Sequence, residues 1–483
     1  MAVDTEHATI TARKDDIARV RAALDGKIDD QILQMPGHDS DDYDRFVKRA
    51  YWLPATQRTH EAYVGMVMSP EPSVQGVPRG MEHLQEDVTS TGEPIERLAA
   101  TIVKEVLATG RCAVLVDYPE TGGEEAITVA RSEAMGLRPY ATYYSYDNVV
   151  NWRTGTVSGR TVLTQIRLRE VFEVETGDFE TDVIERIRVL DLDSGIYRAR
   201  VYERHADSRG KLNWQIVSTA YPRKNGQYLS EIPCFVFGVS SLDINQAVQA
   251  EPPMLPLSNV NIAHLNNSAS LEWALLWVGS PTLFLAGRVP TDGQGQPLPI
   301  RLGSSSALVM EENSKAEILQ ASAESLGALR QAMEDKRRDM VSIGSRVLQE
   351  SGTGQISTET DASQQAGERS TLAQIAGTVS DGLTKVLSLM IDWAGQPNNE
   401  VSVALNTDYA PKDLTPQELT AWTNAVQQGA LPQSMFLALL KKRGAAAQEL
   451  TLDEFEDEIE EGGMGQDDTT DFDQTEPPED VTS

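Results

Sequence analysis

One segment, PPMLPLSNVNIAHLNNSASLEWALLWVG (252–279), sets the expected architecture of this chain. Its prolines stand at the beginning, where a helix tolerates them, and no helix-breaking residue follows before Gly279. Apolar side chains recur every three or four residues, which is typical of one face of a helix. The pattern predicts a helix over 252–278. The recurring positions are Leu257, Val260, His264, Leu271, Leu275 and Val278, and polar Asn261, Asn266, Asn267 and Ser268 lie between them.

A second helix is predicted over 321–350. The residues before it, 279–320, contain prolines, glycines and two short strand-like runs, PTLFLAG and ALVM. Positions of the second helix repeat alternately at three and four residues, which is the spacing of a coiled-coil seam, with one charged interruption at Lys336. Such a seam suits either a helical core within the chain or a contact between subunits. The seam consists of Leu326, Leu329, Met333, Lys336, Met340, Ile343 and Val347.

A run of charges, EDKRRD, occupies the middle of the second helix. Acids and bases are interleaved in it, so local ion pairs such as Glu334 with Arg338 fit a solvated helix face. From the residues alone, a solvated face is favoured over a specific binding role. The run consists of Glu334, Asp335, Lys336, Arg337, Arg338 and Asp339.

A polar loop, ESGTGQISTETDAS (350–363), separates the second helix from a third. It carries two glycines, no lysine or arginine, and one sizeable apolar side chain, Ile356. A wide apolar stripe predicts the third helix over 362–394. A strand is predicted over 400–409, and the capping boxes TPQE and TLDE indicate further helices within 415–461.

The first half of the chain mixes helices and strands. The spacing of its apolar residues predicts a helix over 93–109, and the apolar run RCAVLVDY (111–118) predicts a buried strand directly after it. Residues 140–238 alternate strand-like runs with turn residues, among them TVLTQIRLR, VIERIRVLDL, YRARVYER, WQIVSTAY and IPCFVFG. The sequence therefore predicts an α+β fold.

Composition excludes several classes of protein. The chain has 483 residues, too many for one ordinary domain, and its net charge of −31 argues against tight binding of nucleic acid. Its most apolar stretch, 271–287, contains a glutamate and a proline, so no membrane helix is expected. Cys112 and Cys234 lie in apolar runs and are expected to be buried thiols. The acidic tail over 462–483 is expected to be disordered.

No motif in the sequence indicates an enzyme. No Gly-Lys pair has the rest of a phosphate-binding loop, the six histidines are scattered, and no Gly-x-Ser-x-Gly elbow occurs. We therefore expect no catalytic residue, no metal site and no cofactor. His264, on the first helix, is expected to make a structural hydrogen bond.

Several stretches share their order and local sequence with one known family. They are YWLPATQRTHEAYVGMVMSPEP (51–72), EVLATGRCAVLVDYP (105–119), EIPCFVFG (231–238), NVNIAHLNNSASLEWALLWVGSPTLFLAG (259–287), LGALRQAMEDKRRDMVSIGSRVL (326–348), and the helix over 362–394 with NNEVSVALNTDY after it. In this order they resemble the portal proteins, the head–tail connectors of tailed bacteriophages. The resemblance covers residues 40–460 and rests on arrangement, because that family has no catalytic signature.

The resemblance implies a portal-type fold, an α+β chain divided into named parts. These would be an α/β wing (1–251), the two stem helices (252–278 and 321–350), a small β-containing clip (279–320), a tunnel loop (351–361), a spine helix with its return strand (362–414), a short helical crown (415–461) and the acidic tail (462–483).

The same resemblance implies a function and a set of partners. Copies of the chain would form a ring, a dodecamer, at one vertex of the capsid, and double-stranded DNA would pass through it during packaging and ejection. The terminase large subunit and a head–tail adaptor would dock on the ring. The major capsid protein and a scaffold protein would also contact it, and no membrane is involved. The chain would be found in the virion, and in the host cytoplasm during assembly.

Three sets of site residues follow from the resemblance. The tunnel loop would line the DNA channel, and its glycines, its hydroxyl groups and its acids, including Glu350, would keep contact with phosphate weak. The charged run of the stem would form a cationic band in the channel or, as we prefer, pair with acids of a neighbouring subunit. The loop residues are Ser351, Gly352, Thr353, Gly354, Gln355, Ile356, Ser357, Thr358, Glu359, Thr360 and Asp361, and the clip surface for partners comprises Arg288, Asp292, Gln294, Gln296 and Arg301.

Two other kinds of protein fit parts of this sequence. One is a different helical virion component, such as a capsid protein, a tail adaptor or a scaffold-type protein, although small adaptors lack the helix–insert–helix unit at 252–350. The other is an enzyme with an unrecognised carboxylate site, because the abundant acids offer many chance pairs.

Overall fold

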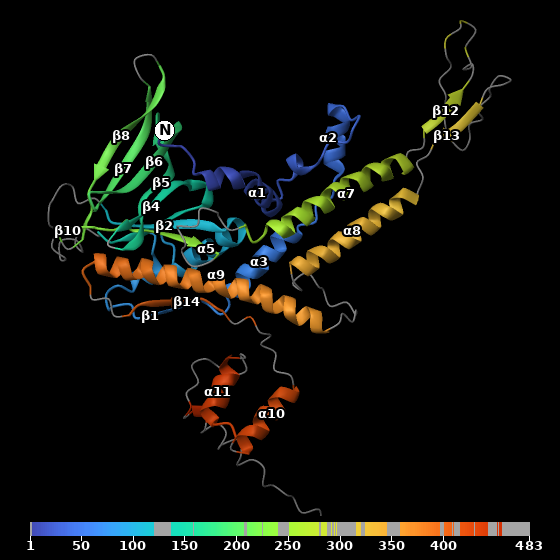
Figure 1. Cartoon of the computed structure of the whole chain (residues 1–483). Coiled ribbons are helices and arrows are strands. Elements are labelled where there is room, and N and C mark those ends of the chain that lie inside the picture. The colour runs from blue at the N-terminus through green and yellow to red at the C-terminus, as the bar shows by residue number, and fades with distance from the viewer. Residues whose placement is uncertain are drawn as a thin grey trace, which may run out of the picture. The chain divides into compact units, whose positions relative to one another are not determined.

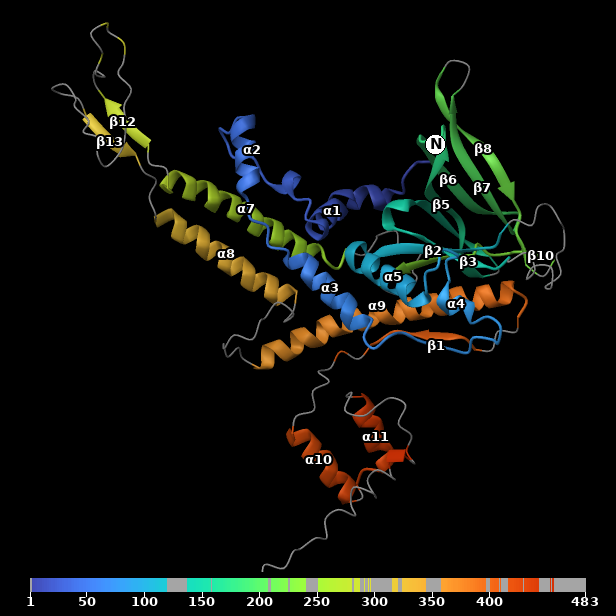
Figure 2. The ribbon, with the colours of Figure 1, turned by 180° about the vertical axis from the view of Figure 1, so that it is seen from behind.

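The chain is an α+β protein that divides into two compact units, Met1–Thr407 and Asp408–Ser483 (Figures 1 and 2). The computed structural model describes residues 2–119, 137–157, 159–206, 210–224, 226–239, 251–279, 282–286, 291, 294, 296, 315–319, 324–344, 358–396, 400–407, 409, 416–428, 430–442, 452, 454 and 455.

The elements of the described residues carry the labels of Figure 1. The helices are α1 (Ala8–Asp25), η1 (Asp29–Gln31), α2 (Ser40–Arg49), α3 (Ala55–Val67), α4 (His83–Glu86), α5 (Ile95–Thr109), η2 (Tyr146–Asn148), α7 (Leu255–Gly279), α8 (Glu324–Ile343), α9 (Thr358–Trp393), α10 (Pro416–Gln427) and α11 (Gln433–Lys442). The strands are β1 (Ser73–Gln75), β2 (Arg111–Asp117), β3 (Tyr140–Tyr144), β4 (Val149–Val157), β5 (Arg160–Glu175), β6 (Thr181–Asp193), β7 (Ile196–Ala206), β8 (Leu212–Ala220), β9 (Arg223–Lys224), β10 (Gln227–Tyr228), β11 (Cys234–Gly238), β12 (Thr282–Ala286), β13 (Lys315–Leu319) and β14 (Ser402–Ala404).

A three-stranded antiparallel sheet, in the order β11-β2-β3, lies at the core of the first unit. Its central strand β2 is buried from Cys112 to Val116, as the apolar run predicted, and both cysteines are buried free thiols. Helix α5 precedes β2 directly because Gly110 takes the left-handed conformation that ends the helix, with a φ of 81°. The same helix turns buried Ile95, Leu98 and other apolar side chains into this core.

Glu105 of α5 ties three elements together by a buried ion pair. Its carboxylate accepts hydrogen bonds from Nη1 and Nη2 of Arg21 in α1, at 3.0 and 2.6 Å, and from the backbone N–H of Tyr146 in η2, at 2.9 Å. The charge of the carboxylate raises the pKa of Arg21 against the opposing effect of burial. The pair therefore holds α1 on the core at a fixed place.

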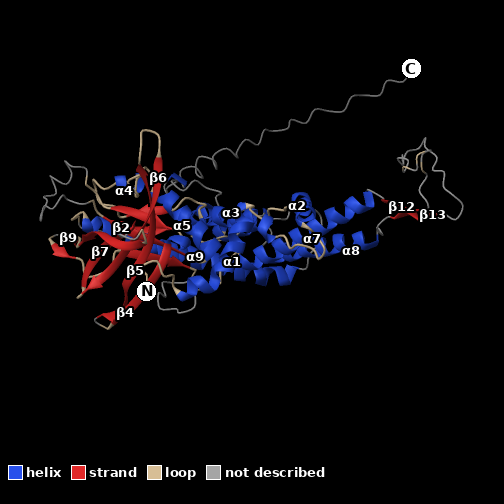
Figure 3. Ribbon diagram, turned by 90° about the horizontal axis from the view of Figure 1, so that it is seen from above, coloured by secondary structure: helices blue, strands red, loops and turns tan. Residues whose placement is uncertain are grey.

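A five-stranded antiparallel sheet, β4-β5-β6-β7-β8 in chain order, forms the strand-rich end of the first unit (Figure 3). The N-terminal residues lie across it. The backbone N–H of His7 donates to the carbonyl of Val150 at 2.9 Å, and the His7 ring stacks on Trp152 at 4.0 Å. The guanidinium of Arg111 lies 4.2 Å from the centre of the same indole ring. These contacts fix the start of the chain on one face of the sheet.

Strands β5 and β6 extend past the rest of this sheet as a two-stranded hairpin (Figure 3). The β4–β5 ladder ends at Leu168, and the β6–β7 ladder begins at Arg186. Between these residues β5 and β6 pair only with each other, up to Glu175 opposite Thr181. The sequence predicted both strands but not this extension.

Helices α7 and α8 form an antiparallel pair, and the antiparallel strands β12 and β13 lie beyond the end of α7 and the start of α8 (Figures 1 and 2). Leu257 of α7 and Met340 of α8 belong to one buried apolar cluster with residues of α1, α3 and α5. Past the end of α8, a Cβ added at Gly344 would lie 3.0 Å from Leu257 and 3.2 Å from Thr59. The chain therefore approaches α7 and α3 closely at this point.

Helix α9 passes along the three-stranded sheet and carries β14 on its other side (Figure 2). The hydroxyl oxygens of Thr384 and Ser380 accept the backbone N–H groups of Val403 and Leu405, both at 3.0 Å. β14 in turn pairs with β1. The apolar stripe predicted for this helix is buried at Leu372, Ile375, Val379, Leu383, Val386, Met390 and Trp393.

The second unit contains α10 and α11. Helix α10 begins at Pro416, directly after the threonine of the TPQE capping box. The rings of Phe436 in α11 and Phe455 lie 6.2 Å apart, and Phe455 is buried. Most of the TLDE capping box and the acidic tail lie outside the described residues.

Several boundaries differ from the sequence prediction. Helix α9 begins at Thr358, so Thr358–Asp361, expected in a loop, form its first turn. Helix α8 ends at Ile343 before a glycine, and 345–350 lie outside the described residues. The second strand of the insert is β13, KAEIL, whereas the predicted run ALVM lies outside the described residues.

Candidate functional site

The polar side chains in the middle of α7 bind the backbone of the N-terminal segment. Asn261 accepts the N–H of Thr56 at 3.1 Å and donates to the carbonyl of Leu53 at 2.9 Å. Asn266 and Ser268 make equivalent bonds to the backbone further upstream, at Gln31, Leu33 and Tyr51. These residues are therefore structural anchors, and each satisfies backbone groups that α2 and its connections would otherwise leave unpaired.

His264 lies on α7 opposite the charged run of α8. It is 0% exposed, and neither ring nitrogen has a hydrogen-bond partner among the described residues, so the predicted structural hydrogen bond is wrong. Burial lowers its pKa to about 4, with help from the nearby charges of Arg337 and Lys336, and Glu334 opposes them. The imidazole of His264 is therefore neutral near pH 7 and fills the space between the two helices.

The charged run of α8 is an exposed surface apart from Lys336, which is half-buried. Two ion pairs form within the helix, from Arg337 to Glu334 at 3.9 Å and from Arg338 to Asp335 at 3.5 Å. These pairs span three residues and differ from the predicted pair of Glu334 with Arg338. Exposed pairs of this kind contribute at most about 1 kcal/mol each, so all of these charges stay available to a partner.

A groove of about 390 Å³ runs between α7 and α8 beside this run. Small and polar side chains of α7 form one wall, and Lys336 lies with two aspartates on the other. The lining residues are Asn259, Val260, Ala263, Ala332, Asp335, Lys336 and Asp339.

The other predicted site residues are only partly within the described residues. Of the tunnel loop, 351–357 lie outside them and Thr358–Asp361 belong to α9. Of the clip surface, Gln294 and Gln296 are described, and Arg288, Asp292 and Arg301 are not.

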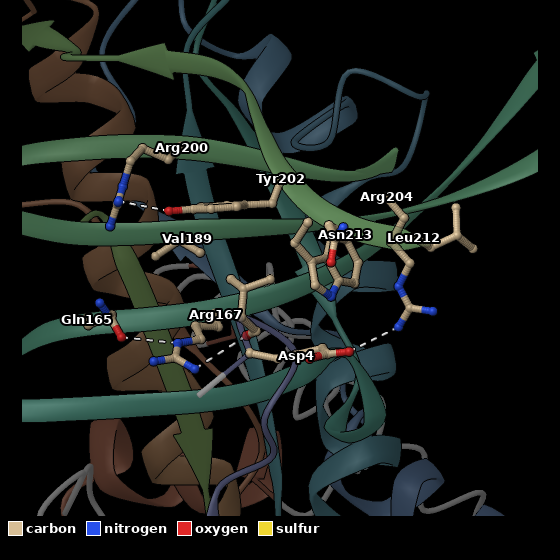
Figure 4. Close-up of a pocket in the computed structure, with 12 residues that line it drawn as sticks. Asp4, Gln165, Arg167, Val189, Arg200, Tyr202, Arg204, Leu212 and Asn213 are labelled. Carbon is tan, nitrogen blue, oxygen red and sulfur yellow. Dashed lines mark hydrogen bonds and ion pairs between the residues drawn. The ribbon is translucent and has the colours of Figure 1, made fainter. Parts of the chain in front are cut away.

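A larger hollow, of about 650 Å³, lies on the face of the five-stranded sheet that the N-terminal residues cross (Figure 4). We call it the arginine pocket, because Arg167, Arg200 and Arg204 point into it from β5 and β7. Apolar, aromatic and polar side chains form the rest of its lining. The remaining lining residues are Ala2, Val3, Asp4, Gln165, Val189, Tyr202, Leu212, Asn213 and Trp214.

The three arginines of the arginine pocket differ in whether a carboxylate neutralises their charge. Arg204 donates to Asp4 at 3.0 Å, and Arg200 pairs with Asp191 and donates to the hydroxyl of Tyr202 at 2.8 Å. Arg167 has only neutral partners within the described residues, the side-chain oxygen of Gln165 at 3.1 Å and the carbonyl of Val3 at 3.3 Å.

The surroundings of Arg167 disfavour its charge. Burial lowers the pKa of Arg167, and the nearby charges of Arg153 and Arg200 lower it further. The described part of the chain shows no carboxylate in ion-pair contact with Arg153 either. The chain as a whole is acidic, with a net charge of −31, whereas Arg153 and Arg167 place two uncompensated cations on this face of the sheet. An anionic group entering the pocket would be stabilised by these cations.

The sequence contains a weak signal for this pocket. Arginines are separated by two or four residues in IRLR and YRARVYER, and an even spacing places them on one face of a strand. The described residues contain no cluster of three or more potential metal ligands. Nor does any helix among the described residues have the length and apolar character needed to cross a membrane.

Comparisons with known proteins give one family and several distant structures. A family model described as a domain of unknown function, DUF4055, matches residues 253–394. No curated protein matches the chain.

Among solved structures, a chain from "Neck of empty GTA particle computed with C6 symmetry" is similar over 88% of this chain and 93% of that chain, with a TM-score of 0.37 and 10% identity. A chain from "Virion of native gene transfer agent (GTA) particle" covers 86% and 95%, with a TM-score of 0.36 and 10% identity. A third, from "Neck of native GTA particle computed with C12 symmetry", covers 85% and 95%, with a TM-score of 0.35 and 10% identity. At this level the likeness does not establish a common fold.

Proposed function

We propose that this chain is the portal subunit of a tailed-phage-like particle. Copies would form a ring of twelve at one capsid vertex, and double-stranded DNA would pass through it during packaging and ejection. The observation that carries the proposal is the α7–β12–β13–α8–α9 arrangement, together with the sequence resemblance stated above. The DUF4055 model spans 253–394, nearly the same residues as α7 to α9, which supports treating these elements as one unit.

The dimensions of these helices suit a stem and a spine. At 1.5 Å per residue, α7 and α8 are about 37 and 30 Å long, and α9 is about 54 Å long. An antiparallel pair with a β-hairpin beyond one end can cross a protein shell and present the hairpin outside it. In this proposal β12 and β13 belong to the clip, which would dock the terminase large subunit during packaging and the adaptor afterwards.

The net negative charge of the chain suits a channel through which DNA slides better than a site that binds DNA tightly. A subunit charge of −31, repeated around a ring, repels a phosphate backbone within the range of about 10 Å that salt leaves unscreened. The proposed tunnel residues 351–361 contain no lysine or arginine, so they would form no salt-dependent grip on phosphate. A channel of this kind lets DNA slide.

The charged run of α8 would lie between neighbouring stems. Its ion pairs are intrahelical, weak and exposed, and its three bases lie between acids on both sides. If the charged residues of this run paired instead with the same run of a neighbouring subunit, the number of ion pairs would stay the same and the two copies would be joined. We therefore favour pairing between subunits over a cationic band facing the DNA.

Labelling of assembled particles tests the proposed function. An antibody against this chain should bind at one vertex of each particle, and particles assembled without the chain should contain no nuclease-protected DNA. Label spread over the whole shell, or DNA-filled heads without the chain, would contradict the proposal.

A further inference from the structure

The β5–β6 hairpin has the features of a docking element. Every residue from Val171 to Val183 is exposed, on both faces of the ribbon. This stretch, VFEVETGDFETDV, contains five acidic residues and no basic residue, and we call it the acidic hairpin. Phe179, at its tip, is 100% exposed.

An isolated two-stranded ribbon with exposed apolar side chains is unfavourable in water. Two strands alone are marginally stable, and exposed apolar residues with unpaired strand edges mark an interaction surface. The large apolar side chains of the acidic hairpin are Val171, Phe172, Val174, Phe179 and Val183, each at least 36% exposed. The hairpin therefore needs a partner that accepts both apolar and acidic side chains.

The arginine pocket and its edge offer both kinds of contact. Arg167 in the pocket lacks a carboxylate partner among the described residues, and so does Arg153, which lies outside the pocket lining on β4, opposite Gln165. Leu212 at the pocket rim is 61% exposed beside Trp214. A hairpin tip with Phe179 between Asp178 and Glu180 would place an aromatic ring against the apolar rim and carboxylates beside the arginines.

Within one copy the tip cannot reach this pocket without bending. The pocket residue Arg204 lies 3.8 Å from Glu185 at the base of the hairpin. From that base the ribbon runs on for about 20 Å, at 3.3–3.4 Å per residue, before it turns. The tip and the pocket are therefore separate surfaces of one chain, which is the condition for a head-to-tail contact between copies.

We propose that the acidic hairpin of one copy inserts its tip into the arginine pocket of the next copy. The contact is heterologous, and heterologous contacts generate closed rings when the rotation between copies allows it. The inference rests on the proposed ring, because the partner is a second copy of the chain. It names the two surfaces that would join neighbouring copies.

Cysteine cross-linking of the full-length chain tests the docking. The two native cysteines are suitable background, because both are fully buried and burial raises the pKa of each thiol, that of Cys234 to about 12. The double variant Phe179→Cys with Leu212→Cys should form a ladder of disulfide-linked multimers on mild oxidation. Each single variant should give no ladder beyond a dimer. The matched control, Phe179→Cys with Leu33→Cys, uses a second exposed leucine outside the pocket and should not form the ladder.

Charge exchange supplies a second readout in the cysteine double variant. Arg153→Glu with Arg167→Glu should lower the cross-linked fraction about tenfold, because like charges then face each other. Adding Asp178→Arg with Glu180→Arg should restore it, which a folding defect would not allow.

The outcomes separate this inference from the proposed function. Closed rings without the ladder, or a ladder that charge exchange does not change, overturn the docking and leave the ring standing. Rings whose pocket takes up inorganic phosphate while the hairpin stays uncross-linked assign the pocket to a small anion and also overturn the docking. A chain that stays monomeric with its scaffold and forms no ladder overturns both.

Discussion

The fit of α9 against the three-stranded sheet depends on the missing side chain of Gly382. A Cβ built at this position would lie 2.3 Å from Cε1 of Phe237 in β11, and 2.9 Å from two further atoms of the same ring. Ordinary contacts begin at 3.4 Å, so Gly382→Ala creates an overlap of about 1 Å. The ring has no room to retreat, because Phe237 is only 1% exposed and its strand is paired with β2.

The expected cost follows from two opposing effects. Alanine in a helix interior is favoured over glycine by about 1 kcal/mol, whereas overpacking a buried core costs about 1–3 kcal/mol and more for a large overlap. We therefore expect Gly382→Ala to lower the free energy of unfolding by about 1–2 kcal/mol. Gly377→Ala is the matched control in the same helix, because nothing lies within 4 Å of its added Cβ, and it should raise that free energy by about 0.5–1 kcal/mol.

Urea denaturation of the two variants, followed by far-UV circular dichroism, measures the difference. The double variant Gly382→Ala with Phe237→Leu should recover part of the loss, since the two positions are in contact. If Gly382→Ala proves as stable as Gly377→Ala, the close packing of α9 on β11 is wrong.

Three further predictions concern charge. Glu105→Gln should lower the free energy of unfolding by about 1.5–3 kcal/mol in urea titrations, because it weakens charge-assisted hydrogen bonds to the half-buried Arg21 and leaves that arginine only the exposed Asp147 as a charged partner; an unchanged midpoint would contradict a stabilising role of that pair. The pKa of His264 is about 4 in the folded chain against 6.5 for an unperturbed histidine, so the unfolded chain binds the proton first and stability falls as pH drops from 6.5 to 4. The loss should reach about 2–3 kcal/mol, and His264→Leu should remove this part of the pH dependence; equal slopes in both proteins would refute it. Replacing Lys336, Arg337 and Arg338 with glutamine should weaken ring assembly, measured by native mass, whereas intact rings with altered DNA retention would favour the cationic band instead.

The sequence predicted the elements whose apolar pattern matches their burial. The spacing of Ile95, Leu98 and Ile102 marked α5, and the continuous apolar run after it marked β2 as a central strand. The boundaries were less predictable. The sequence predicts the start of α9 at residue 362, four residues late, because the polar run TETD is also typical of a loop.

Features that depend on tertiary contacts escaped the sequence. The strand β13 has only five residues, KAEIL, too few for periodicity to distinguish it from a loop. Phe179 at the hairpin tip is exposed because the β4–β5 and β6–β7 ladders stop short of it. No local sequence pattern predicts where those ladders stop. For the same reason the arginine pocket could not be assembled from sequence, because the pairing register of β5, β6 and β7 brings Arg167 opposite Val189 and Val189 opposite Arg200. Buried polar side chains are generally hydrogen-bonded, which is why a hydrogen bond was expected for His264. Its two ring nitrogens have no partner among the described residues.

Electron microscopy of the purified chain, with its native mass measured in parallel, tests the central claim most directly. The proposed function predicts closed rings of twelve copies with an axial hole wide enough for a DNA duplex. A chain that stays monomeric alone is examined again with its scaffold protein, and rings should then form. Small compact oligomers with no hole under both conditions would contradict the portal assignment.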